Sequence, residues 1–95
     1  MQQRLLNQLR ATKQILEEQF GITKIAVFGS YARDEQREES DVDIVILEAT
    51  QKTLHNRLNA KKMLEKKLNK KVDIGYFDSM KTFIKNRIKK ELIYV

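Results

Sequence analysis

The sequence predicts one two-layer α/β domain of the α+β class, in which helices pack on a small mixed β-sheet. A chain of 95 residues leaves room for a single domain, residues 1–95. Segments with helical periodicity alternate with short β-rich runs in the order α-β-loop-β-α-β-α, which is typical of such a domain. No proline, repeat or low-complexity stretch interrupts this order.

The first half of the chain has the pattern of one helix followed by two strands. Residues 2–19 carry leucines at intervals of three and four residues, and Gly21 follows as a helix stop. The runs KIAVF (residues 24–28) and DIVIL (residues 43–47) are rich in β-forming residues. The second run is continuously apolar, which predicts a central strand.

The second half has the pattern of a helix, a strand and a last helix. The run KVDIGYF (residues 71–77) predicts the third strand, and Asp78 and Ser79 are expected N-caps of the last helix. The final LIYV (residues 92–95) predicts either a short strand or a segment that packs against a partner. Residues 52–68 are expected to form a helix with one apolar face, made by Leu54, Leu58, Leu64 and Leu68.

Composition excludes some classes of site and protein. The chain has no cysteine and therefore no thiolate metal site, and no apolar run approaches the roughly 20 residues that span a bilayer. We therefore expect a cytoplasmic protein without membrane association. The formal charge is +6, with most lysines in the second half. These lysines either attract nucleic acid or form the solvated faces of helices, and we favour the second interpretation.

Three polar segments should meet at one end of the sheet. A connection with at most one short helix joins the first two strands, so we expect them to run antiparallel. The helix between the second and third strands is long enough for a parallel crossover. The end of the first strand would then lie beside the starts of the other two. The residues at this edge are Gly29, Ser30, Asp41, Asp43 and Asp73.

These residue types suit a metal–nucleotide site. Asp41 and Asp43 alternate across one residue and point to one face, and such close carboxylates repel unless a cation or a proton intervenes. Mg²⁺ prefers a few carboxylates together with water and phosphate oxygens. Gly29 and Ser30 would meet a phosphate with free backbone N–H groups at a helix start and with a hydroxyl.

Each of these signals is weak when it stands alone. A D-x-D pair can be two solvated carboxylates, and a Gly-Ser step is ordinary turn chemistry. Asp73 can be an edge-strand charge that discourages aggregation. Their conjunction at one sheet edge, in this order and spacing, favours the metal–nucleotide site.

The same residues resemble the motifs of a known superfamily. Gly29-Ser30, ten further residues and then Asp41-x-Asp43 match the G-S-x10-D-x-D signature of the DNA polymerase β-like nucleotidyltransferases. GSYAR is similar to the G-S-x-A-R turn of that superfamily, and KKVDIGYF resembles its later strand with a third aspartate. The small size and the C-terminal KNRIKKELIYV resemble the minimal nucleotidyltransferase (MNT) subgroup. Asp34 departs from the pattern, because the family usually has glycine there.

The resemblance implies a nucleotidyltransferase fold and an antitoxin activity. Members of the MNT subgroup are similar to antitoxins that transfer AMP from ATP to a tyrosine of a HEPN-domain ribonuclease toxin. By this resemblance, Asp41 and Asp43 would bind two Mg²⁺ ions. Asp73 would complete the metal site at the acceptor and help to remove the hydroxyl proton.

The resemblance also assigns the phosphate-binding residues. Gly29 and Ser30 would hold the terminal phosphates of ATP. Arg33 would either bind phosphate or brace the turn against nearby carboxylates, and we favour the brace. Tyr31 and Tyr76 are expected to pack in the core, and His55 is expected to be exposed rather than a ligand.

Other functions remain open from the sequence. The domain is too small to enclose a nucleotide, so we expect a hetero-oligomer or a homodimer whose second chain completes the pocket. The alternative function is a non-catalytic antitoxin or binding subunit that neutralises its partner by complex formation. A nucleic-acid modifier that uses the lysine-rich helices ranks last.

Overall fold

The sheet of the protein has four strands in the order β3-β2-β1-β4. The computed structural model describes residues 1–95. Strand β1 is antiparallel to β2 and β4, and β2 is parallel to β3, so the predicted strand directions are confirmed. The elements are α1 (Gln3–Phe20), β1 (Ile22–Phe28), β2 (Val42–Ala49), α2 (Leu54–Leu68), β3 (Val72–Tyr76), the 3-10 helix η1 (Phe77–Ser79), α3 (Thr82–Ile88) and β4 (Ile93–Tyr94).

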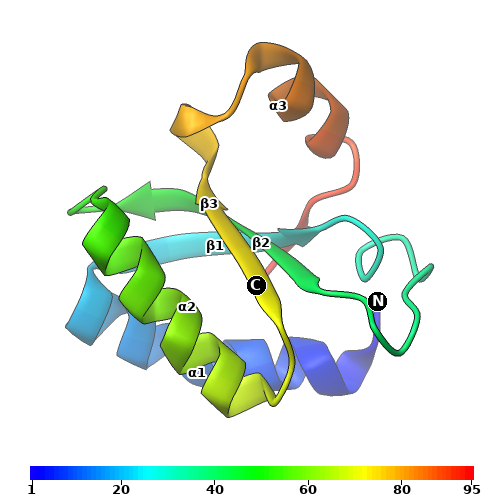
Figure 1. The fold of residues 1–95 in the computed structure, drawn as a ribbon, viewed down its shortest axis with the longest axis horizontal. Helices are drawn as coiled ribbons and strands as arrows, with labels where there is room; N and C mark the ends of the chain where they lie inside the picture. The colour runs from blue at the N-terminus through cyan, green and yellow to red at the C-terminus, as the bar shows by residue number, and fades with distance from the viewer.

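The helices cover the two faces of the sheet unequally. The long helices α1 and α2 pack on one face, and the short α3 lies on the other (Figure 1). The main core of 16 buried residues lies between the sheet and α1 and α2. A smaller core of Ala26, Val45 and Ile88 lies beneath α3. The predicted α+β class with a small mixed sheet is confirmed, and the face with α3 is left partly open.

Local sequence signals account for the ends of the long helices. Gly21 ends α1 as predicted, with φ 64°, and its N–H bonds the carbonyl oxygens of Leu16 and Glu17. This left-handed conformation favours glycine, which has no Cβ to clash. Helix α2 begins after Thr53, whose hydroxyl accepts a hydrogen bond from the Asn56 N–H at 3.0 Å.

The predicted N-caps of the last helix are wrong. Asp78 and Ser79 lie in η1, and α3 begins later, after Lys81, which makes no side-chain cap. The Asp78 carboxylate instead pairs with the Lys52 ammonium at 2.6 Å. An N-cap carboxylate has to turn back onto its own helix, and this ion pair draws Asp78 to another segment.

The apolar face predicted for residues 52–68 is too wide. Leu54 and Leu58 are 62% and 40% exposed, and the buried residues of α2 are Ala60, Leu64 and Leu68. Leu58 lies about 120° around the helix from Leu64, because each residue turns the helix by about 100°. A four-residue repeat of buried side chains therefore leaves Leu58 on the outer side.

The C-terminal run forms a strand. Residues Ile93 and Tyr94 pair with Val27 and Ala26 at the edge of the sheet. None of the three helices combines the length and the apolar character that crossing a membrane requires.

Candidate active site

Three segments that are distant in sequence meet at one end of the sheet. Strand β1 ends at Phe28, opposite Asp43 near the start of β2. In the parallel pair, Asp43 lies in register with Asp73 near the start of β3. Asp41 precedes β2 by one residue. The predicted edge, with its glycine-serine turn and its aspartates, is therefore present in the structure.

The aspartates lie on the more open face of the sheet. Val42 and Ile44 face the main core beneath α1 and α2, whereas Val45 faces the small core beneath α3. Because side chains alternate along a strand, Asp43 shares the face of Val45. Asp41 and Asp73 are exposed, and Asp43 is half-buried.

The surroundings of Asp43 disfavour its charged form. Burial, followed by the charges of Asp73 and Asp41, raises the pKa of the Asp43 carboxyl from the ordinary 3.8 to about 6. The Arg33 guanidinium acts in the opposite direction. A group with this environment would gain from a nearby cation, which relieves both the repulsion and part of the lost hydration.

Gly29 allows the Asp43 carboxylate to lie against the backbone of the turn. A Cβ at position 29 would stand 2.1 Å from Asp43 Oδ2 and 3.0 Å from its carboxyl carbon. Gly29 also has φ 74°, a conformation that side chains with a Cβ rarely adopt. The positive φ and the close carboxylate therefore both favour glycine at the first position of the motif.

The segment after Gly29 is a turn rather than the expected helix start. Residues 30–34 form the turn, closed by hydrogen bonds from the Arg33 N–H to the Gly29 carbonyl oxygen (3.1 Å) and from the Glu35 N–H to the Ser30 carbonyl oxygen (2.9 Å). Asp34 has φ 57°. Asp34 therefore adopts a conformation that glycine reaches at lower cost, which is a physical reason for the glycine that the resemblance leads one to expect at this position.

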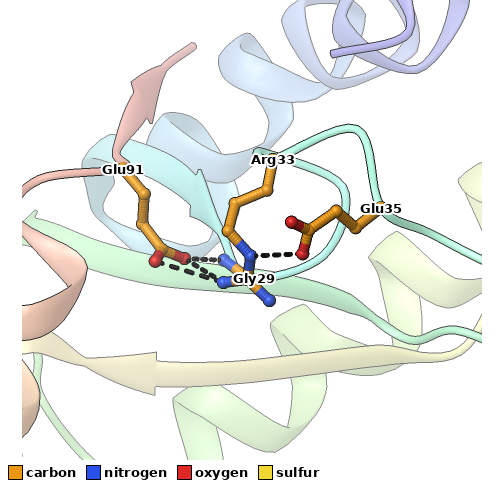
Figure 2. A network of polar contacts seen from close by, with 4 residues as sticks. All are labelled: Gly29, Arg33, Glu35 and Glu91. Atoms are coloured by element: carbon orange, nitrogen blue, oxygen red, sulfur yellow. Dashed lines mark hydrogen bonds and ion pairs between the residues drawn. The ribbon is translucent and has the colours of Figure 1, made fainter.

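Two donors of the turn, the Gly29 N–H and the Arg33 guanidinium, are already engaged by carboxylates. Figure 2 shows Glu91, which approaches the turn from the segment before β4. Its Oε2 accepts hydrogen bonds from the Gly29 N–H and from Arg33 Nη1, the latter at 3.0 Å. Arg33 Nε also donates to Glu35 at 3.0 Å. The hydrogen bond to Glu35 raises the pKa of Arg33 above its ordinary value, and Glu91 adds to this effect.

Sequence reasoning missed Glu91. It is the only acidic residue after Asp78, but it lies 62 residues from Gly29 in the sequence, and no local pattern links it to the turn. Only the pairing of β4 with β1 brings it to the turn, and the sequence left the fate of residues 92–95 open.

The carboxylates are neighbours but do not yet form a metal-ligand set. No group of three or more His, Cys, Asp or Glu side chains is arranged to hold a metal ion. Like charges repel, and the exposed Asp41 and Asp73 side chains can remain in water. The donor types nevertheless fit magnesium, because hard carboxylate oxygens on one edge are what this ion binds. The raised pKa of Asp43 points in the same direction.

The aromatic and histidine side chains lie where the sequence predicted. Tyr31 is 2% exposed and packs in the main core. Tyr76 is also buried, and its hydroxyl donates to the Thr53 carbonyl oxygen at 2.8 Å. His55 is exposed and contacts Asn59. These residues are structural rather than part of the edge site.

Comparisons with known proteins assign the chain to a family. A family model described as a nucleotidyltransferase domain matches residues 9–95. The chain is 38% identical over 87 residues to the protein adenylyltransferase MntA of Thermococcus cleftensis, a match that covers 92% of this chain and 88% of that protein. A protein of Methanocaldococcus jannaschii, provisionally named a protein adenylyltransferase, is 41% identical over 90 residues, which cover 92% of this chain and 90% of that protein.

Solved structures have the same fold. A structure provisionally described as a minimal nucleotidyltransferase matches with a TM-score of 0.80 and 30% identity, and the match covers 98% of this chain and 95% of that one. A chain in the crystal structure of a toxin–antitoxin complex with AMP-PNP matches with a TM-score of 0.75 and 24% identity, over 93% of this chain and 71% of that one. The second likeness is one of fold.

Proposed function

The chain belongs to the nucleotidyltransferase domain family, and we propose that it transfers AMP from ATP to a hydroxyl group of a protein. Nucleotidyl transfer is the activity of the family. The adenylyl group and the protein acceptor are supported by relatives at 38% and 41% identity that are named protein adenylyltransferases. The observation that carries the proposal is the meeting of the Gly29 turn with Asp43 and Asp73 at one sheet edge.

Each aspartate has a proposed role at this edge. Asp41 and Asp43 would hold two magnesium ions, which would stabilise the negative charge of the reacting phosphates. Asp73 serves the acceptor side, where it orients the hydroxyl and receives or relays its proton. The support is the register of Asp43 with Asp73 and the mutual repulsion of these carboxylates without a cation.

The transfer step exchanges one bond to the α-phosphorus for another. The acceptor oxygen forms a bond to the α-phosphorus, the bond from that phosphorus to the α,β-bridging oxygen breaks, and pyrophosphate leaves in line. The hydroxyl proton passes to Asp73 or to water. We assign Gly29 and Ser30 to the terminal phosphates, and Arg33 to bracing the turn through Glu35, with which it pairs at 3.0 Å.

The proposed acceptor is a tyrosine of a HEPN-domain toxin, so the chain would act as an antitoxin. Chains with this fold occur in toxin–antitoxin complexes, one with AMP-PNP and one described as a tri-AMPylated HEPN toxin with its MNT antitoxin. We infer that the whole chain acts as one domain and that the toxin or a second copy completes the nucleotide pocket. The alternative is an antitoxin that neutralises the toxin by binding alone.

Two labels of ATP separate these functions. The chain is incubated with Mg²⁺, a HEPN-domain toxin from the same organism and ATP labelled at either the α- or the γ-phosphorus. AMP transfer labels the toxin from α-labelled ATP only. A stable complex without label would support the binding antitoxin, and label from γ-labelled ATP would indicate phosphoryl transfer instead.

A further inference from the structure

The Glu91 carboxylate lies where an anion would be expected to bind the turn. It accepts hydrogen bonds from the backbone N–H of Gly29 and from the Arg33 guanidinium, at 3.0 and 3.1 Å from Nη1 to its two oxygens (Figure 2). The side chain of Glu91 is only 17% exposed. Glu91 is therefore a largely buried carboxylate held by two donors, and its pair with Arg33 is not an ordinary exposed ion pair.

The two donors are of the kind that bind phosphate oxygens. A glycine N–H allows close approach of an anion, and an Arg fork binds carboxylate and phosphate with the same geometry. A phosphate oxygen and a carboxylate oxygen cannot occupy the same donors at once. Any phosphate that binds the Gly29 N–H must first displace Glu91.

We propose that Glu91 is a built-in competitor of the nucleotide, which occupies a phosphate position on the Gly29 turn and leaves it when a triphosphate binds. The inference rests on the proposed function, because it takes the Gly29 turn as the phosphate site. It adds a gating residue to that site, contributed by the segment between α3 and β4.

The surroundings of Glu91 allow this release. Its backbone N–H bonds the Ile88 carbonyl oxygen at 2.9 Å, so the side chain can rotate away while the backbone stays in place. Arg33 keeps its hydrogen bond to Glu35 at 3.0 Å after Glu91 leaves, so the guanidinium remains beside the turn. Glu91 also adds a negative charge near Asp43, and the repulsion between the two carboxylates weakens the binding of Glu91 to the turn.

The proposal fixes the direction in which nucleotide affinity changes. If Glu91 occupies the turn for nine-tenths of the time, removal of this competition tightens triphosphate binding about tenfold. A brace would act in the opposite direction, because loss of a positioning carboxylate weakens binding. The sign of the change therefore decides between a gate and a brace.

Three variants, tested for binding of inorganic tripolyphosphate, show whether the affinity for a triphosphate rises or falls. Glu91→Ala removes the carboxylate, and Glu91→Asp keeps its charge but shortens its reach by one methylene group. Glu38→Ala is the matched control, because Glu38 is an exposed glutamate of the loop that follows the turn and has no part in the Gly29, Arg33 and Glu91 contacts. Calorimetry at constant ionic strength with Mg²⁺ should give about tenfold tighter binding for both Glu91 variants and less than a twofold change for Glu38→Ala.

Unchanged or weaker binding in the folded Glu91 variants would overturn the gate. If these variants do not fold, the wild-type protein provides the test: the ¹³C shift of the Glu91 carboxyl carbon should move toward that of a free carboxylate when tripolyphosphate is added, and a constant shift would overturn the proposal. The probe has no base and no transferable AMP. If the Glu91 variants bind tripolyphosphate more tightly but the protein transfers no AMP, the gate is supported and the proposed function is refuted. If the protein transfers AMP but the variants bind no more tightly, the proposed function is supported and the gate is refuted.

Discussion

The substitution Asp43→Asn should stabilise the metal-free protein at alkaline pH and lose this effect in acid. The pKa of Asp43 is raised from 3.8 to about 6. Below 3.8 the carboxyl is protonated in the folded and unfolded states alike, so it has no effect on stability. As the pH rises toward 6 the unfolded chain releases its proton first, and the free energy of unfolding falls. Well above pH 6 the carboxyl is ionised in both states, and its destabilising effect has reached full size.

The size of this effect follows from the same shift. A rise from 3.8 to about 6 corresponds to about 3 kcal/mol, at about 1.36 kcal/mol for each pH unit. Asp43 is only half-buried, so solvent screening reduces the effect, and we expect about 1 kcal/mol. Asn has nearly the same shape as Asp and carries no charge, so it removes most of this cost.

Urea denaturation at pH 8.0 and pH 4.5, with EDTA to remove metal ions, measures the effect. Asp43→Asn should raise the free energy of unfolding by about 1 kcal/mol at pH 8.0 and by less at pH 4.5, where part of the folded-state carboxyl is protonated. Asp78→Asn is the control of opposite sign, because the hydrogen bond from Lys52 lowers the pKa of Asp78. That control should not be stabilised at pH 8.0. A less stable Asp43→Asn protein at pH 8.0 would show that the charged carboxylate is favoured where it lies, and would refute the reasoning.

Three further substitutions test other parts of the site. Gly29→Ala should destabilise the fold by about 1–2 kcal/mol, because φ 74° is strained for alanine and its Cβ would meet the Asp43 carboxylate; an unchanged melting temperature would contradict both restraints. Asp34→Gly should relieve the strain at φ 57° and leave the affinity for Mg-ATP unchanged or higher, although it removes an exposed ion pair with the Met1 ammonium. Weaker binding of Mg-ATP in calorimetry would reveal a positive role for Asp34. Asp73→Asn should lower turnover about a hundredfold or more while Mg-ATP binding stays nearly intact; equal losses of both would move Asp73 to the triphosphate side.

The topology could be predicted from the sequence because simple rules determine it. A helix of crossover length between the second and third strands favours parallel strands, and the short connection between the first two favours an antiparallel pair. These two relations bring Asp43 and Asp73 into register. The G-S-x10-D-x-D spacing then identified the family, and the match over residues 9–95 confirms it.

The details that failed depend on contacts between distant segments. Asp78 has the residue type of an N-cap, but its ion pair with Lys52 involves a segment 26 residues away. Leu58 has the residue type of a core position, but the helix phase leaves it 40% exposed. Glu91 reaches Gly29 only through the pairing of β4 with β1. No local pattern contains this information.

A crystal structure of the protein with Mg²⁺ and a non-hydrolysable ATP analogue tests the central claim most directly. We predict that the carboxylates of Asp41, Asp43 and Asp73 converge on magnesium beside Ser30, with the terminal phosphates on the Gly29 turn. A nucleotide bound away from this edge, or an Asp73 carboxylate that points away from the metal, would contradict the assignment of the three aspartates.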